Sequence, residues 1–263
     1  MTVALLFPGQ GAQSEGLLHH LPEHTEVTRT IKEASDVLGV DTAALDNAEA
    51  LHSTVAVQPA LLIAGVATAR ALMAEHVHPV AVAGMSIGAF GAAVACGTLS
   101  FADALPLVQL RGELMQAAFP SGYGLAFIEG LDEIRVGNLV EQIRTAESPV
   151  YISNINAPRQ IVVAGSDAAL AAVIARALQH GARRAEPLAV AVPSHCPLLQ
   201  SVADRLEKAS GALVRRRSKS RTSSERTYSS KWHRAMSPQT LPQNQSPGGG
   251  RSQSRIGDCV MRP

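Results

Sequence analysis

The chain has 263 residues, of which 46% are apolar and 17% are charged, so it can bury a substantial core as one large domain or two unequal ones. Aromatic residues make up 3%, which argues against a nucleic-acid surface of stacked rings. Its three cysteines, Cys96, Cys196 and Cys259, are odd in number and widely spaced. They support neither a disulfide framework nor a zinc knuckle, and they favour a reducing, cytoplasmic setting.

The net charge of +1 is an average over two unlike parts. Residues 1–213 hold 12 Lys/Arg against 20 Asp/Glu, a net charge of −8, whereas residues 214–263 hold 11 against 2, a net charge of +9. The second part is rich in Ser, Arg, Pro and Gly and has few aliphatic side chains. Because so little apolar surface cannot offset the entropy cost of ordering, we expect residues 214–263 to be a disordered basic tail.

The first expected elements are a buried strand over Val3–Phe7 and an apolar helix over Gln58–His76 that Pro59 opens. The chain start lacks the basic region of a secretory signal. Later, the segment Pro79–Ala102 is free of charge and long enough to cross a bilayer, but four glycines interrupt it. We therefore interpret it as a strand, a turn and a buried helix, and we expect no membrane span.

The strand in this segment is expected over Val80–Ala83 and the helix over Ile87–Cys96, followed by a helix over Phe101–Ala118. This alternation predicts a parallel α/β core, assigned to residues 1–123 and 189–213. Residues 124–188 have the order βαββαβ, which is that of a split βαβ, ferredoxin-like unit inserted as a subdomain. Its expected elements are strand Leu125–Glu129, helix Asp132–Ala146, strands Val150–Ser153 and Gln160–Ala164, helix Asp167–His180 and strand Arg183–Leu188.

Residues Gly84–Gly88 (GMSIG) match the G-x-S-x-G pattern between a strand-like and a helix-like run. The two glycines permit a sharp strand-to-helix turn from which the Ser86 hydroxyl projects. The amide of Ile87, at the start of the helix, can stabilise an oxyanion. The alternative is a glycine-rich helix start with Ser86 as its N-cap. The flanking strand and helix favour a nucleophile.

A serine nucleophile needs a base, and His195 is the candidate because it lies in an apolar loop between Pro193 and Pro197. Spacing assigns no acidic partner to it, and the charged neighbours of Asp204 indicate an exposed helix. Arg111 is a lone cation in an otherwise apolar helix. Its guanidinium is either solvated or suited to hold a bound carboxylate.

The segment FPGQGAQ, residues 7–13, follows the first strand at the carboxyl edge, where open α/β sheets bind ligands. It lacks the G-K-[ST] of a phosphate loop and the G-x-G-x-x-G of a dinucleotide site.

Five segments in this order, FPGQGAQ, GMSIGAF, VQLRGELMQ, ISNINAPRQIVVAG and VPSHCPLL, resemble the malonyl-CoA:acyl-carrier-protein transacylase family over about residues 1–210. The resemblance implies an α/β-hydrolase-like parallel-sheet core with a ferredoxin-like small subdomain, and no bound cofactor or metal. Within that family, ALLFPGQGAQSEGLLHHLP and GMSIGAF look most like the epsilon subunit of bacterial malonate decarboxylase. That subunit loads malonyl groups onto the carrier protein of its complex.

Carried over residue by residue, the resemblance implies ping-pong acyl transfer, in which a serine takes the malonyl group from malonyl-CoA. The acceptor would be the prosthetic thiol of an acyl-carrier protein or of the carrier subunit of malonate decarboxylase, with no nucleic-acid or membrane partner. The implied roles are Ser86 as nucleophile, His195 as base, Gln10 and the amide of Ile87 as oxyanion hole, Arg111 as carboxylate ligand, and Asn154 and Asn156 as neighbours of the site.

Two departures from the family pattern leave other functions open. Met85 stands where most members have His, and residues 214–263 lack the N-P-V-x-W run and the G-P-G turn with which the family continues. The change in composition near Val214 resembles translation in a wrong reading frame. The alternatives are a serine esterase or thioesterase that uses the same G-x-S-x-G geometry, and an inactive acyltransferase-like scaffold.

Overall fold

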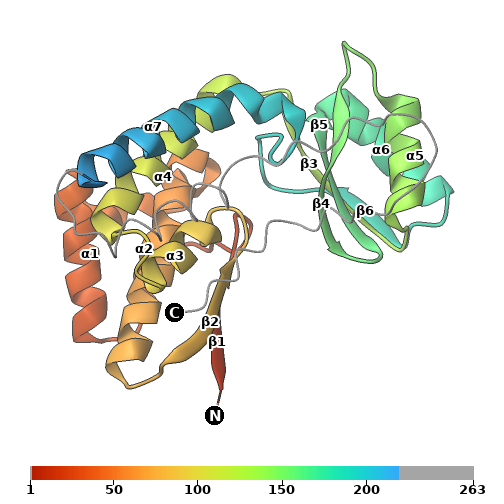
Figure 1. The fold of residues 1–263 in the computed structure, drawn as a ribbon. Helices are drawn as coiled ribbons and strands as arrows, with labels where there is room; N and C mark the ends of the chain where they lie inside the picture. Colours follow the sequence, from red (N-terminus) through yellow and green to blue (C-terminus); the bar gives the residue numbers. More distant parts are fainter. Residues whose placement is uncertain (1, 219–263) are drawn as a thin grey trace.

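The computed structural model describes residues 2–218, which form a larger, mainly helical subdomain and a smaller one beside it (Figure 1). The chain enters the larger subdomain, passes through the smaller one and returns, so helix α7 lies across helix α4 of the larger part. The elements of the larger subdomain are β1 (Val3–Phe7), α1 (Thr25–Leu38), α2 (Thr54–Ala74), β2 (Pro79–Gly84), α3 (Gly88–Ala95), α4 (Phe101–Ala118) and α7 (Gln200–Ser218), with short 3-10 turns at Thr42–Leu45, Ala50–His52 and Pro197–Leu199.

The sheet of the larger subdomain has two parallel strands, β1 and β2. Leu5 pairs with Val82 and Phe7 with Gly84, so both strands end at the same edge. The expected strand, turn and helix within Pro79–Ala102 are confirmed, since β2 leads through a turn into α3. The parallel α/β core that the sequence predicts is therefore present, and helices pack around its sheet.

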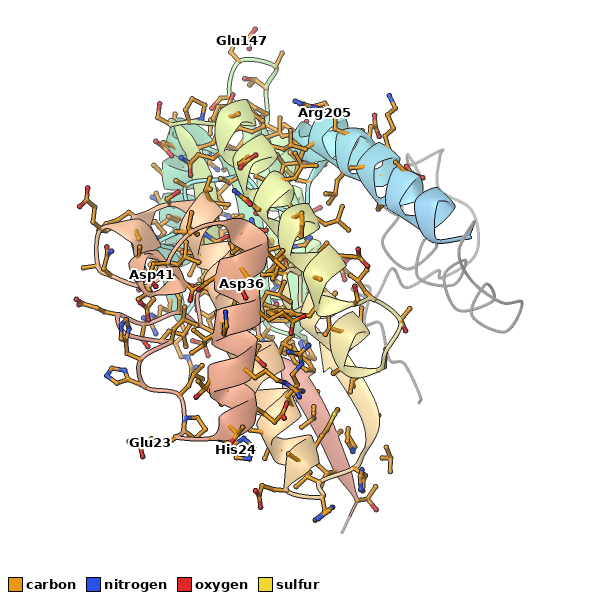
Figure 2. The ribbon with its side chains drawn as sticks, turned by 90° about the vertical axis from the view of Figure 1, so that its left-hand side faces the viewer. Glu23, His24, Asp36, Asp41, Glu147 and Arg205 are labelled. Carbon is orange, nitrogen blue, oxygen red and sulfur yellow. The ribbon has the colours of Figure 1, made fainter. Side chains whose placement is uncertain are left out.

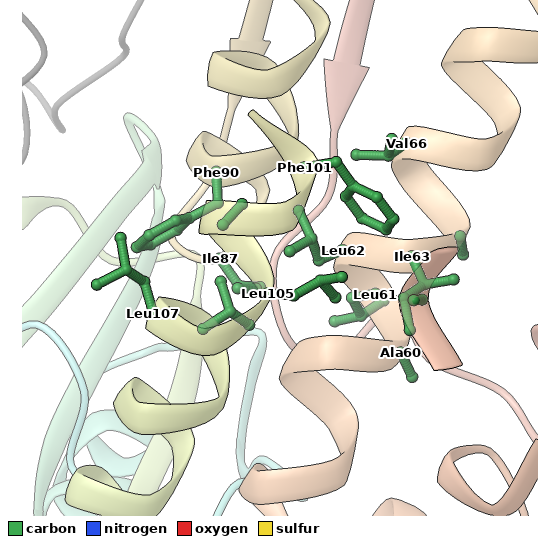
Figure 3. Packing of buried hydrophobic residues seen from close by; sticks show 14 of the residues in the cluster. Ala60, Leu61, Leu62, Ile63, Val66, Ile87, Phe90, Phe101, Leu105 and Leu107 are labelled. Carbon is green, nitrogen blue, oxygen red and sulfur yellow. The ribbon is translucent and has the colours of Figure 1, made fainter. Parts of the chain in front are cut away.

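Helices α2, α3 and α4 supply most of the core of the larger subdomain (Figure 3). Leu62 and Ile63 of α2 pack with Phe90 of α3 and with Phe101 and Leu105 of α4, and all five are at most 2% exposed. Burying one such side chain contributes about 1.5–3 kcal/mol. This packing gives α3 and α4, which carry residues of the candidate site, a rigid base.

Helix α2 begins four residues before the expected start at Gln58, and Pro59 lies inside it. The Ser53 hydroxyl accepts the backbone N–H of Val55 at 3.2 Å, and this cap outweighs the preference of proline for the first turn. Within residues 2–218, α2 alone is long and apolar enough to cross a membrane, and 67% of its most apolar stretch is buried inside the protein. This degree of burial is typical of a helix in a protein core, and we interpret α2 as such a helix.

The smaller subdomain has the predicted βαββαβ order, and its strands form one antiparallel sheet in the order β4-β5-β3-β6. Both of its helices pack on this sheet around a separate core that includes Ile128, Val136 and Val163. The ferredoxin-like topology is therefore confirmed. Its elements are β3 (Tyr123–Glu129), α5 (Glu133–Ile143), β4 (Val150–Ala157), β5 (Gln160–Ser166), α6 (Asp167–Gln179) and β6 (Arg184–Pro187).

Helix α1 has no counterpart among the elements expected from the sequence, although Val27, Thr30 and Ala34 form a buried face at helical spacing. The start is hard to recognise because a histidine, His24, provides the cap by accepting the N–H of Glu26. Figure 2 shows Asp36 on α1 and Arg205 on α7 as exposed side chains.

The basic tail expected over residues 214–263 starts inside a helix, since α7 continues to Ser218. The rest of the expected tail lies outside the described residues. The assignment of residues 1–123 and 189–213 to the core and 124–188 to the subdomain remains our division of the chain.

Candidate active site

Ser86 lies on a sharp turn between β2 and α3, with a left-handed φ of 52°. A non-glycine residue in this conformation costs about 1–3 kcal/mol, which the surroundings must offset. A Cβ on Gly84 would lie 2.2 Å from the backbone of Gly88, and one on Gly88 would lie 2.2 Å from the carbonyl oxygen of Phe7. Both flanking glycines are therefore required by close backbone packing, which is the geometry of a nucleophile elbow.

The Ser86 hydroxyl is held by an arginine from helix α4. Arg111 Nη2 donates to Ser86 Oγ at 3.0 Å, and Arg111 Nη1 donates to Gln58 Oε1 at 2.6 Å. Burial lowers the pKa of Arg111 to about 10, so it stays charged at neutral pH. Among residues 2–218, no carboxylate forms an ion pair with Arg111. The candidate site therefore holds a positive charge beside Ser86 that no described acidic side chain balances.

Gln58 is a site residue that the sequence reading does not identify. It is fully buried on α2, and its Nε2 contacts the Met115 sulfur at 3.4 Å while its Oε1 accepts from Arg111. The available signal is a lone polar side chain in an otherwise apolar helix segment, QPALLIAGV. Gln58 satisfies one side of the Arg111 fork and orients the other side toward Ser86.

His195 lies in the loop between β6 and α7, with a left-handed φ of 57°. Although His195 as a whole residue is exposed, desolvation of its ring by the surrounding protein, and to a lesser extent the charge of Arg111, lower the pKa of His195 to about 4. The ring is therefore neutral at pH 7 and can accept a proton. Within the described part of the chain, Ser86 Oγ has Arg111 as its partner and makes no hydrogen bond to His195.

The loop that carries His195 is packed between the two subdomains. Val192 joins an apolar cluster with Leu114 and Met115 of α4, while Val190 and Cys196 pack against the sheet of the smaller subdomain. Burial raises the pKa of the Cys196 thiol to about 11, which leaves it unreactive beside His195. Both subdomains thus take part in placing the loop of His195.

The residues predicted to form the oxyanion hole, Gln10 and Ile87, lie close to the elbow. A Cβ on Gly9 would meet Met85 Cε at 3.0 Å and the Met85 carbonyl oxygen at 3.1 Å, so the loop that carries Gln10 touches the residue before Ser86. The Gln10 side chain donates to Thr54 Oγ1 at 3.1 Å. Among residues 2–218, the backbone N–H groups of Gln10 and Ile87 have no protein acceptor. Two amides are therefore free to bind an oxygen atom.

Asn154 and Asn156 occupy the last part of β4. Asn154 is half-buried and its Oδ1 lies 3.2 Å from the Ser153 hydroxyl, whereas the exposed Asn156 side chain makes no hydrogen bond within the described residues. Their roles remain predictions. Asp204 accepts from Gln200 at 2.8 Å on the exposed side of α7, as expected of a residue that does not orient His195.

The comparisons with known proteins agree with this geometry. The acyl transferase domain family matches residues 4–246. Malonyl CoA-acyl carrier protein transacylase of Haemophilus influenzae is 44% identical over 210 residues, which cover 77% of this chain and 67% of that protein. The protein of that name from Bacillus subtilis is 35% identical over 211 residues, covering 78% and 67%. The chain thus spans about two thirds of the length of these relatives.

Solved structures show the same two-subdomain arrangement. The malonyl CoA-acyl carrier protein transacylase of Coxiella burnetii superimposes with a TM-score of 0.76 at 37% identity, covering 80% of this chain and 68% of that one. A malonyl-transacylase in complex with a type II polyketide synthase acyl-carrier protein gives 0.75 at 39% identity, covering 81% and 70%. Together with the elbow serine and its arginine, these matches show that the chain belongs to the acyl transferase domain family, among the malonyl-CoA–acyl carrier protein transacylases.

Proposed function

We propose that this protein moves a malonyl group from malonyl-CoA to the thiol of an acyl carrier protein through an ester on Ser86. The observation that carries this proposal is the charge of Arg111, whose Nη2 lies 3.0 Å from Ser86 Oγ and which has no acidic partner among residues 2–218. A half-buried guanidinium whose charge no described acidic side chain balances suits a substrate that carries its own carboxylate, as malonyl does. A simple acetyl or aliphatic ester would leave that charge unbalanced.

In the first half-reaction, Ser86 Oγ attacks the thioester carbon of malonyl-CoA and passes its proton to neutral His195. The N–H groups of Gln10 and Ile87 bind the oxyanion, and Arg111 holds the distal carboxylate. The intermediate collapses as the carbon–sulfur bond breaks, and the CoA thiolate takes the proton from His195. The seryl ester of malonate remains on the protein.

In the second half-reaction, the carrier thiol gives its proton to His195 and its sulfur attacks the ester carbonyl. Ser86 leaves as the alkoxide and regains a proton from His195. Because its pKa is lowered, His195 is neutral at pH 7 at the start of each half-reaction and has a nitrogen lone pair that can accept the proton. The carrier of malonate decarboxylase is the narrower prediction for the acceptor, and a cytoplasmic setting is predicted from the cysteine usage.

Labelling separates this function from its alternatives. The protein is incubated with malonyl-CoA that is radiolabelled in the malonyl group, freed of CoA, and then mixed with carrier protein. Label that passes from protein to carrier supports transfer. Label that appears as free malonate without carrier supports a thioesterase, and a chain that never becomes labelled supports an inactive scaffold. The Ser86→Ala variant is the control for non-specific labelling.

A further inference from the structure

A β-bulge in the smaller subdomain points a serine at the loop that carries His195. In the pairing of β4 with β5, Ile152 lies opposite Val163 and Asn154 lies opposite Val162, so Ser153 is an extra residue without a partner. A bulge of this kind re-aims a side chain and is common beside active sites. Here the side chain that it turns is the Ser153 hydroxyl.

Ser153 Oγ donates to the backbone carbonyl oxygen of Ser194 at 2.9 Å, across 41 residues of sequence. A second contact, to Asn154 Oδ1, is longer at 3.2 Å. A hydroxyl has a single proton, so the shorter contact takes it. Ser194 is 7% exposed, which makes its carbonyl group a buried acceptor that needs a partner.

This contact acts on His195 through the peptide bond between residues 194 and 195. The Ser194 carbonyl and the His195 nitrogen share one rigid plane, so an anchor on the carbonyl oxygen limits rotation at the His195 nitrogen. His195 has a φ of 57°, a conformation that a non-glycine residue keeps only when its surroundings hold it. The apolar contacts of Val192 and Val190 hold the loop against the protein core. Apolar packing is not directional, so these contacts do not fix the rotation of the 194–195 peptide.

We propose that Ser153 is a positioning residue, which fixes the 194–195 peptide so that the imidazole of His195 faces Ser86 and Arg111. The inference rests on the proposed function for its role in catalysis. It also couples the two subdomains, because any movement of β4 relative to α4 would be transmitted to the base through this hydrogen bond.

The test compares Ser153→Ala with Ser153→Thr and with Ser148→Ala. Threonine keeps the hydroxyl and suits a strand. Ser148 is the matched control, because among residues 2–218 its Oγ bonds only to Ser166 Oγ, at 3.0 Å, within the same subdomain. Two quantities are measured on the full chain: the single-turnover rate of Ser86 acylation by malonyl-CoA, and the titration of the His195 ring by NMR, which requires no substrate.

For Ser153→Ala we expect acylation to slow by about tenfold with little change in KM, because a misplaced base costs rate rather than binding. The pKa of His195 should rise toward its ordinary value as the ring becomes more hydrated. Ser153→Thr should restore both quantities, and Ser148→Ala should change neither.

The proposal is overturned if Ser153→Ala leaves the His195 titration unchanged, whatever happens to the rate. It is also overturned if Ser148→Ala reproduces the effect. A wild-type chain that takes no label, but whose His195 titration still responds to Ser153→Ala, would refute the acyl-transfer function while leaving the positioning role intact.

Discussion

Replacing Arg111 by alanine should weaken malonyl transfer far more than acetyl transfer. The guanidinium touches Ser86 Oγ at 3.0 Å and has no acidic partner in the described chain, so a malonyl carboxylate is the anion it would bind. Acetyl has no carboxylate and loses only the contact between Arg111 and the nucleophile. The ratio of the two activities therefore isolates the role of the charge.

The size of the effect follows from the burial of the arginine. Leaving a fully buried charge without its partner costs about 3–5 kcal/mol. Arg111 is only partly buried, so we take about 3 kcal/mol, which corresponds to a loss of roughly 150-fold in kcat/KM for malonyl-CoA. For acetyl-CoA, the loss of one hydrogen bond to Ser86 is worth about 1 kcal/mol, or roughly fivefold.

The assay measures kcat/KM for both thioesters with carrier protein as acceptor, for the wild type, Arg111→Ala and Gln58→Leu. The Gln58 variant keeps the charge but removes the 2.6 Å contact that orients the fork, so we expect a malonyl loss of about tenfold. Equal losses for malonyl and acetyl in Arg111→Ala would refute the carboxylate role, because they would mean that Arg111 serves only the nucleophile.

Three other outcomes follow from the site. Ser86→Ala should abolish covalent labelling by malonyl-CoA, as shown by mass spectrometry of the intact protein; a labelled variant would place the nucleophile elsewhere. Because the pKa of His195 is lowered to about 4, acylation should be constant between about pH 6 and 8 and fall only below about pH 5, as the base becomes protonated; a midpoint near pH 6.5 would contradict this. Gly88→Ala should lower the free energy of unfolding in urea by about 1–3 kcal/mol, since its Cβ would lie 2.2 Å from the Phe7 carbonyl oxygen. The control Gly137→Ala, with only an ordinary contact in helix α5, should be neutral or stabilising by about 0.5–1 kcal/mol, and equal effects of the two would remove the argument for close packing at the elbow.

The nucleophile elbow and the ferredoxin-like order could be predicted from the sequence because both depend on residues that are close together in the chain. A strand, two glycines around Ser86 and a helix lie within one short segment, and the alternation of residues 124–188 shows each strand and helix in turn. The same holds for helix α4, which has the bounds expected from its apolar run, Phe101–Ala118. Local sterics and hydrophobic periodicity are enough for such features.

Helix α2 shows where local signals compete. Proline is common in the first turn of a helix, so Pro59 predicts a start near Gln58. The Ser53 cap and the burial of Thr54 instead place the start at Thr54. Helix α1, capped by a histidine, has a weaker local signal still. In both cases, packing onto the core decides where the helix lies: α1 buries one face, whereas α2 is buried on all sides over residues 56–64.

The sequence alone determined which residue types could act at this site, and the tertiary structure decided how they meet. Gln58 reaches Arg111 across 53 residues, Arg111 reaches Ser86 across 25, and Ser153 reaches the His195 loop across 41. No pattern in the chain encodes these distances directly. Each contact joins elements that lie far apart in the chain, so the orientation of these polar groups depends on packing that forms only in the complete fold.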